Sequence, residues 1–189
     1  MNQMENLMKI FASLFLSTTI LSGCASLFSS TTGADATGQC FAPSRIDAST
    51  FDRVADSALE RSATRLPDSG GVRCAAVYQL KTGETATVYR VYGGKGWRFG
   101  RWWTFTRPSG DSTMYRKDYE ICRAWNSLDS LAICALKVGS RFAIGPGQSA
   151  VCGNDPGYGT SDSLQVFFAN PRDDLDTANC RFEPLTWGR

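Results

Sequence analysis

The sequence predicts a single α+β domain that is stabilised by disulfides. Three observations support this prediction. Two segments have the apolar spacing of amphipathic helices, several short runs rich in β-branched and aromatic residues are bounded by glycine or proline, and six cysteines are spread along the predicted domain. The helical segments lie early and in the middle of the chain, whereas strand-like runs dominate its second half.

The first residues have the properties of an export signal. Residues 10–21 read IFASLFLSTTIL, an apolar run that suits a signal peptide and is shorter than the ~20 residues that cross a bilayer. The tetrapeptide LSGC at 21–24 resembles the bacterial lipobox. This resemblance implies cleavage before Cys24, a lipid on its sulfur and attachment to a membrane. The alternative is an ordinary signal peptide, or a buried amino-terminal helix, that happens to end in cysteine.

The domain organisation follows from this signal. Residues 1–23 are the predicted lipoprotein signal peptide, residues 24–39 have the small and polar composition of a flexible tether, and residues 40–189 form one domain. Ala25 follows the lipobox cysteine, where aspartate favours retention in the inner membrane of the lipoproteins that this segment resembles. We therefore expect an exported protein that is anchored in the bacterial envelope, at the outer membrane.

The chain contains seven cysteines, an odd number for an exported protein. Assigning Cys24 to the lipid leaves an even set that could form three disulfides, and sequence alone permits 15 pairings of such a set. We favour sequential pairing, including Cys122 with Cys134 and Cys152 with Cys180, because it closes short loops. We expect no metal site, because the chain has neither histidine nor a C-x-x-C pair. The six remaining cysteines are Cys40, Cys74, Cys122, Cys134, Cys152 and Cys180.

Charge and composition exclude several functions. The net charge is +2 without a strong basic tract, so we expect no nucleic acid as a partner. The absence of histidine excludes Ser-His-Asp and Cys-His hydrolases, which need an imidazole base. Any chemistry must therefore use carboxylates, hydroxyls, amides, arginine or lysine.

The elements are predicted in chain order. Apolar residues from Phe51 to Ala63 have helical spacing, with Ser49 or Thr50 as cap and Pro67 at the end. Residues 72–80 and 86–94 read as strands joined by the turn 81–84, and thus as a hairpin. An aromatic strand around 102–105 precedes a second helix in 111–126, which Asp111 or Ser112 caps. Three further strand segments are expected within 131–139, 141–151 and 163–171.

Three short segments occur in a fixed order: VYRVYGG with Arg90, GRWWTFT with Trp103 and Thr104, and DSLQVFF with Gln165. Together with the intervening helix that contains Trp-Asn, this series resembles the compact ADP-ribosyltransferase domains of bacterial polymorphic toxins. The resemblance covers about residues 85–171, and it implies two packed antiparallel β-sheets with flanking helices. It also implies NAD as the substrate and an acceptor, such as a protein, for ADP-ribose.

The same resemblance implies roles for individual residues. Arg90 would bind a phosphate or ribose through its donors, Trp102 and Trp103 would line the NAD cleft, and one of these rings would stack on nicotinamide. Thr104 would orient either the ribose or the triad that it forms with Arg90 and Gln165. Gln165 would hydrogen-bond a ribose hydroxyl in the reaction. Many transferases of this superfamily carry glutamate in place of Gln165. Three carboxylates elsewhere in the chain are candidates to supply that charge: Asp162, Glu120 and Glu183.

A second hypothesis is a non-enzymatic envelope lipoprotein that acts as a binding or structural module with an envelope partner. In that case the aromatic strand forms an interaction surface, and Arg90 and Gln165 are ordinary surface residues. Convergence of Arg90, Thr104 and Gln165 on one pocket would favour the transferase hypothesis, and their separation would favour the module.

Overall fold

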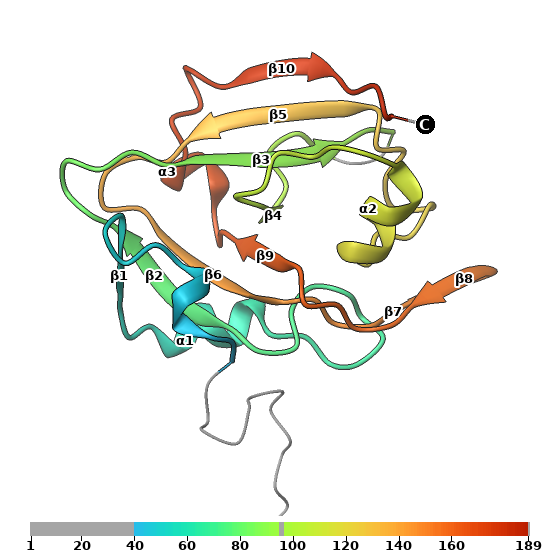
Figure 1. The fold of residues 1–189 in the computed structure, drawn as a ribbon, viewed down its shortest axis with the longest axis horizontal. Coiled ribbons are helices and arrows are strands. Elements are labelled where there is room, and N and C mark those ends of the chain that lie inside the picture. The colour runs from blue at the N-terminus through green and yellow to red at the C-terminus, as the bar shows by residue number, and fades with distance from the viewer. Residues whose placement is uncertain (1–39, 95–96, 189) are drawn as a thin grey trace, which may run out of the picture. The chain divides into compact units, whose positions relative to one another are not determined.

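A computed structural model describes residues 40–94 and 97–188, and this part of the chain is built mainly of antiparallel strands (Figure 1). It has few helices and three disulfides, so the α+β prediction is confirmed. The signal peptide predicted for residues 1–23, the tether predicted for residues 24–39 and the predicted lipidation of Cys24 lie outside the described residues.

The strands form three sheets in which every pair of named strands is antiparallel. The five-stranded sheet has the order β1 (Phe51–Arg53), β2 (Ala76–Leu80), β6 (Arg141–Pro146), β9 (Leu164–Phe167) and β4 (Trp102–Trp103). The three-stranded sheet has the order β10 (Arg181–Pro184), β5 (Ser130–Ala135) and β3 (Thr87–Tyr92). The small third sheet pairs β7 (Ala150–Cys152) with β8 (Asp155–Tyr158).

The main core lies between the two larger sheets, which Figure 1 shows as two layers. Alternate residues of each strand face it, as expected for strands with one face in the core. Tyr78 and Leu80 of β2 contribute from one sheet, and Val88 of β3 contributes from the other. Phe142 of β6 is fully buried there among other aromatic rings.

Helix α1 (Ser57–Ala63) covers the other face of the five-stranded sheet, where Leu59 packs with Val77 and Phe167. Asp56 caps it, since its Oδ1 accepts a hydrogen bond from the N–H of Leu59 at 3.0 Å. The predicted helix began at Phe51, and this start was wrong because α1 begins at Ser57. Residues 51–53 pair with β2 instead, and this pairing buries the ring of Phe51 against the main core.

The remaining helical elements are short: η1 (Pro43–Arg45), α2 (Ser112–Asp118) and α3 (Pro171–Asp174). None of the helices in the described ranges is long and apolar enough to cross a membrane. Asp111 caps α2 as predicted, because its Oδ1 accepts hydrogen bonds from the N–H groups of Thr113 and Met114. Helix α2 ends earlier than predicted, so the segment from Tyr119 to Asn126 is a loop rather than a helical face.

The predicted hairpin of residues 72–80 and 86–94 was also wrong. Strands β2 and β3 follow one another in sequence, but they belong to different sheets. β2 pairs with β1 and β6, whereas β3 pairs with β5. The connection that contains Gly83 therefore passes from one layer of the core to the other.

The disulfides join Cys40 with Cys74, Cys122 with Cys152, and Cys134 with Cys180. The expected pairs Cys122 with Cys134 and Cys152 with Cys180 were wrong. The reason is strand pairing over long distances in sequence: Arg181 of β10 lies opposite Ile133 of β5, which brings the neighbouring cysteines together. Three disulfides are typical of an exported protein in an oxidising compartment.

Candidate functional site

The two larger sheets meet beside β4. Tyr89 of β3 donates its N–H to the carbonyl of Thr104 at 2.8 Å, and Thr104 donates its N–H to the carbonyl of Tyr89 at 2.9 Å. This bridge joins the edge strand β3 of one sheet to the segment that follows the edge strand β4 of the other. Side chains from both sheets therefore come together at the junction.

A cavity of about 640 Å³ lies at this junction. Its walls come from β3, β4, β9, the loop that follows α1, and α2 with the loop that follows it. Its volume is in the range of small-molecule sites in proteins. Four of the five residues that the sequence analysis placed in a site line it: Arg90, Trp102, Trp103 and Gln165.

Arg90 is half-buried, and two of its five N–H donors are hydrogen-bonded to backbone carbonyls. Its Nε donates to the carbonyl of Trp97 at 2.8 Å, and its Nη1 donates to the carbonyl of Trp102 at 2.6 Å. No carboxylate of the described residues forms an ion pair with it. Burial lowers the pKa of Arg90 to about 10, so the guanidinium remains charged at neutral pH.

The two neighbouring tryptophans differ in accessibility. Trp103 is 3% exposed, donates its Nε1–H to the carbonyl of Gly100 at 2.7 Å and packs edge-on against Phe168 in the main core. Trp102 is half-buried, and its ring centroid lies 4.8 Å from that of Phe167. Trp102 is therefore the better candidate for a ring that contacts a ligand.

Thr104 does not line the cavity, in contrast to the role that the resemblance implied. It is 2% exposed, and its hydroxyl lies 3.0 Å from the hydroxyl of Tyr119, within hydrogen-bond distance. The same hydroxyl accepts a hydrogen bond from the N–H of Thr106. Thr104 thus supports Tyr119, which does line the cavity.

Gln165 and Glu120 form a buried pair in the cavity wall. The side-chain Nε2 of Gln165 donates to Oε2 of Glu120 at 2.6 Å and to the carbonyl of Gly71 at 3.1 Å. Glu120 is 1% exposed, and burial raises its pKa to about 8, so that the side chain is a neutral acid at pH 7. Ser161 and Arg73 oppose this shift but do not outweigh burial.

Backbone geometry holds Glu120 in this place. Its φ of 47° lies in the left-handed region, which is uncommon for residues other than glycine. The carboxyl group packs on Gly147, where a side chain of any size would collide with both carboxyl oxygens. Arg116 of α2 fixes the loop by donating Nη2 to the carbonyl of Asn126 at 2.8 Å and Nη1 to the carbonyl of Ile121 at 3.2 Å.

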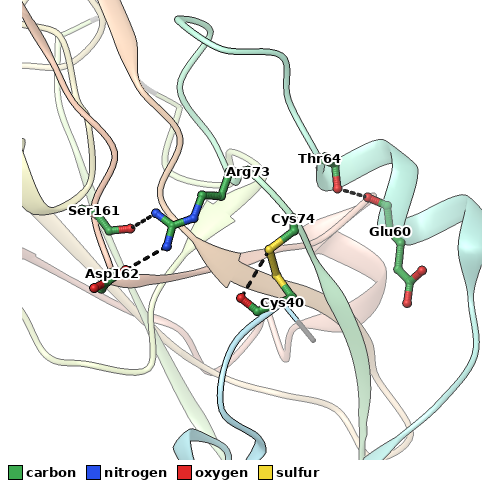
Figure 2. Close-up of a disulfide and its surroundings, with 7 residues drawn as sticks. All are labelled: Cys40, Glu60, Thr64, Arg73, Cys74, Ser161 and Asp162. Carbon is green, nitrogen blue, oxygen red and sulfur yellow. Dashed lines mark hydrogen bonds and ion pairs between the residues drawn. A yellow bond between two sulfur atoms is a disulfide. The ribbon is translucent and has the colours of Figure 1, made fainter. Parts of the chain in front are cut away.

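The other two candidate carboxylates lie elsewhere. Figure 2 shows Arg73, beside the disulfide of Cys74, pointing toward Ser161 and Asp162. Its guanidinium donates to the carbonyl of Ser161 at 3.0 Å and forms an ion pair with Asp162 at 2.8 Å. Glu183 pairs with Arg107 at 2.6 Å. Of the three carboxylates considered, Glu120 is the one that lines the cavity.

Several lining residues were not predicted from the sequence. Tyr115 and Tyr119 pack against each other with ring centroids 4.5 Å apart, and burial raises the pKa of both phenols. Trp125 is 45% exposed and packs beside Gly70. The apolar spacing that suggested a long helix was the sequence signal for Tyr115 and Tyr119, and Trp125 also belongs to the Trp-Asn helix of the resemblance, but neither signal gave these rings a role in the site.

Comparison with protein families, curated proteins and solved structures finds no match for this chain. Within the described ranges, no group of three or more histidine, cysteine, aspartate or glutamate side chains is arranged to hold a metal ion.

Proposed function

We propose that this chain is a lipid-anchored envelope protein whose domain binds NAD in the cavity and transfers its ADP-ribose to an acceptor. The observation that carries the proposal is that Arg90, Trp102 and Gln165 line one cavity, although they lie on three strands of two different sheets. The motif order that resembles the ADP-ribosyltransferase domains supplies the identity of the ligand. Cys24 is the proposed attachment point for the lipid, and replacement by serine should release the protein from the membrane fraction.

The side chains that line the cavity suit the pyrophosphate, the nicotinamide ring and the ribose of NAD. The pyrophosphate is an anion, and Arg90 is a partly buried cation with unused donors and no carboxylate partner in the described chain. The nicotinamide ring is flat and matches the accessible ring of Trp102. Gln165 offers its side-chain carbonyl oxygen as an acceptor for a ribose hydroxyl, because its Nε2 already donates to Glu120 and to the carbonyl of Gly71.

The proposed reaction transfers ADP-ribose from NAD to the acceptor and releases nicotinamide. The bond between the ribose carbon and the nicotinamide nitrogen breaks, and its electron pair leaves with neutral nicotinamide. A nucleophilic atom of the acceptor forms the new bond to the ribose carbon and loses its proton to solvent. In this reaction the residues of the cavity bind and orient NAD as positive charge develops on the ribose.

A second candidate is a non-enzymatic module that binds its ligand without turnover. Three observations favour it. Arg90 already donates two hydrogen bonds to backbone carbonyls, and Thr104 is bonded to Tyr119 instead of facing the cavity. A neutral Glu120 also lacks the negative charge that would stabilise a ribosyl cation at pH 7.

Incubation of the purified chain with NAD labelled in the nicotinamide and adenosine parts separates these candidates. We expect release of nicotinamide, and a loss of at least about tenfold in Gln165→Ala and Arg90→Lys, because both lose contacts to the ligand. Gln79→Ala on β2 is the control and should leave the rate unchanged, since Gln79 does not line the cavity. Circular dichroism checks that each variant is folded.

Binding of NAD without nicotinamide release would favour the non-enzymatic module. Absence of both binding and release would overturn the proposed function. Equal rates in the Gln165 and Gln79 variants would show that any turnover takes place outside this cavity.

A further inference from the structure

The side-chain amide of Gln165 presents its oxygen, and not its nitrogen, to the cavity. Its Nε2 carries two hydrogens and donates to Oε2 of Glu120 at 2.6 Å and to the carbonyl of Gly71 at 3.1 Å. Among the described residues, the only buried side-chain nitrogen or oxygen without a partner is Oε1 of Glu120, so Oε1 of Gln165, which has no partner either, is accessible at the cavity wall. Gln165 can therefore accept a hydrogen bond from a ligand, but it has no hydrogen left to donate.

The two partners of Gln165 determine which end of its amide faces the cavity. The backbone carbonyl of Gly71 can only accept, so it requires the nitrogen of the amide beside it. Oε2 of Glu120 is the closer of the two acceptors and takes the second hydrogen. A flip of the amide would place the oxygen of Gln165 against these two acceptor oxygens and lose both hydrogen bonds.

Glu120 is itself held in place. The residue is 1% exposed, and its backbone has a φ of 47°. Its carboxyl group packs on Gly147, where a side chain would collide with both carboxyl oxygens. The disulfide of Cys122 with Cys152 ties down the loop that follows. An acceptor that cannot move away keeps the amide of Gln165 in one orientation before any ligand arrives.

We propose that Glu120 is a positioning residue, which acts on the ligand through Gln165, and that the pair restricts this part of the cavity to a ligand group that donates a hydrogen bond. The inference rests on the proposed function, under which that group is a hydroxyl of the nicotinamide ribose. A group that cannot donate would leave Oε1 of Gln165 without a partner once the ligand excludes water. Glu120 thus contributes to selectivity without touching NAD.

The first test follows the side-chain amide of Gln165 by NMR in the full chain in detergent, without ligand. We expect its N–H protons to exchange with solvent at least about tenfold more slowly than those of Gln79, whose side-chain nitrogen donates no hydrogen bond in the described chain. Glu120→Gln keeps a side-chain oxygen that accepts, and it should retain this protection. Glu120→Met has a similar length without an acceptor oxygen, and it should lose most of the protection.

The second test is a calorimetric titration of the same chains with NAD and with two analogues, in which fluorine replaces the 2′- or the 3′-hydroxyl of the nicotinamide ribose. The native chain should bind one analogue about tenfold more weakly than NAD, because fluorine cannot donate to Gln165. In Glu120→Met this difference should fall to about twofold or less, whereas Glu120→Gln should keep it. Glu84→Met, in the exposed segment after β2, is the matched control and should behave as the native chain.

Protection of the Gln165 amide that Glu120→Met removes, together with loss of the preference for the hydroxyl in that variant alone, supports the inference. A native chain whose Gln165 amide exchanges as fast as that of Gln79 overturns it, and this result does not depend on whether Glu120→Met folds. NAD binding with the same preference in Glu120→Met as in the native chain overturns the inference and leaves the proposed function standing. The expected amide protection without NAD binding to any of the chains supports Glu120 as the positioning residue of Gln165 and overturns the proposed function.

Discussion

Replacement of Glu120 by glutamine is expected to stabilise the domain by about 3 kcal/mol at pH 7, because it removes a group that folding must keep protonated. The pKa of Glu120 is about 8 in the folded chain, and the ordinary value for a glutamate is 4.5. Above pH 4.5 the unfolded chain loses this proton, whereas the folded chain retains it until about pH 8. The folded state then binds more protons, so its stability falls as the pH rises through this window.

Glutamine has the shape of the neutral acid and does not titrate. The difference in unfolding free energy between Glu120→Gln and the native chain should therefore be small at pH 4 and grow up to about pH 8. Urea denaturation at pH 4, 7 and 9 measures it, and Glu84→Gln serves as an exposed control with a small and constant difference. A difference that does not depend on pH, or a loss of stability at pH 7, would contradict the neutral state of Glu120.

Replacement of Phe142 by alanine is expected to cost about 3–5 kcal/mol of unfolding free energy. The ring is fully buried on β6, and its centroid lies 5.2 Å from that of Phe51 and 5.2 Å from that of Phe105. Phe168 packs against it as well, with centroids 6.1 Å apart. These rings come from separate segments, so alanine would leave a cavity that no single neighbour can fill.

Urea denaturation with the disulfides intact measures this loss, and Phe182→Ala is the matched control. Phe182 lies on the edge strand β10 and is 38% exposed, so its truncation should cost clearly less. Equal losses for the two variants would show that the cluster around Phe142 is not the centre of the core.

The sequence predicted which segments form strands better than it predicted which strands and which cysteines pair. Short runs rich in β-branched and aromatic residues, bounded by glycine or proline, identified the segments of β2, β3, β5, β6 and β9, because such composition is a local property. The hairpin and two disulfide pairs were wrong because they depend on which strands become neighbours. β2 pairs with β6 and β5 pairs with β10 across long connections, and no local pattern encodes these choices.

The site was predictable to a similar degree. Short motifs identified Arg90, Trp102 and Gln165, which all reach the cavity. Glu120 was only one of three candidate carboxylates, because its position depends on its own left-handed backbone, which follows the C-cap residue Tyr119 of α2. The disulfide of Cys122 with Cys152 then holds the loop that follows. The one local signal for Glu120 in the sequence is that a charged residue stands between Tyr119 and Ile121.

Binding of NAD to the cavity is the central claim, and an NMR titration of the isotope-labelled chain with NAD tests it most directly. We expect the indole N–H of Trp102 and the side-chain amide of Gln165 to shift, while backbone amides of β10 stay unchanged because this strand does not line the cavity. The absence of any shift at millimolar NAD, or shifts confined to residues away from the cavity, would contradict the claim.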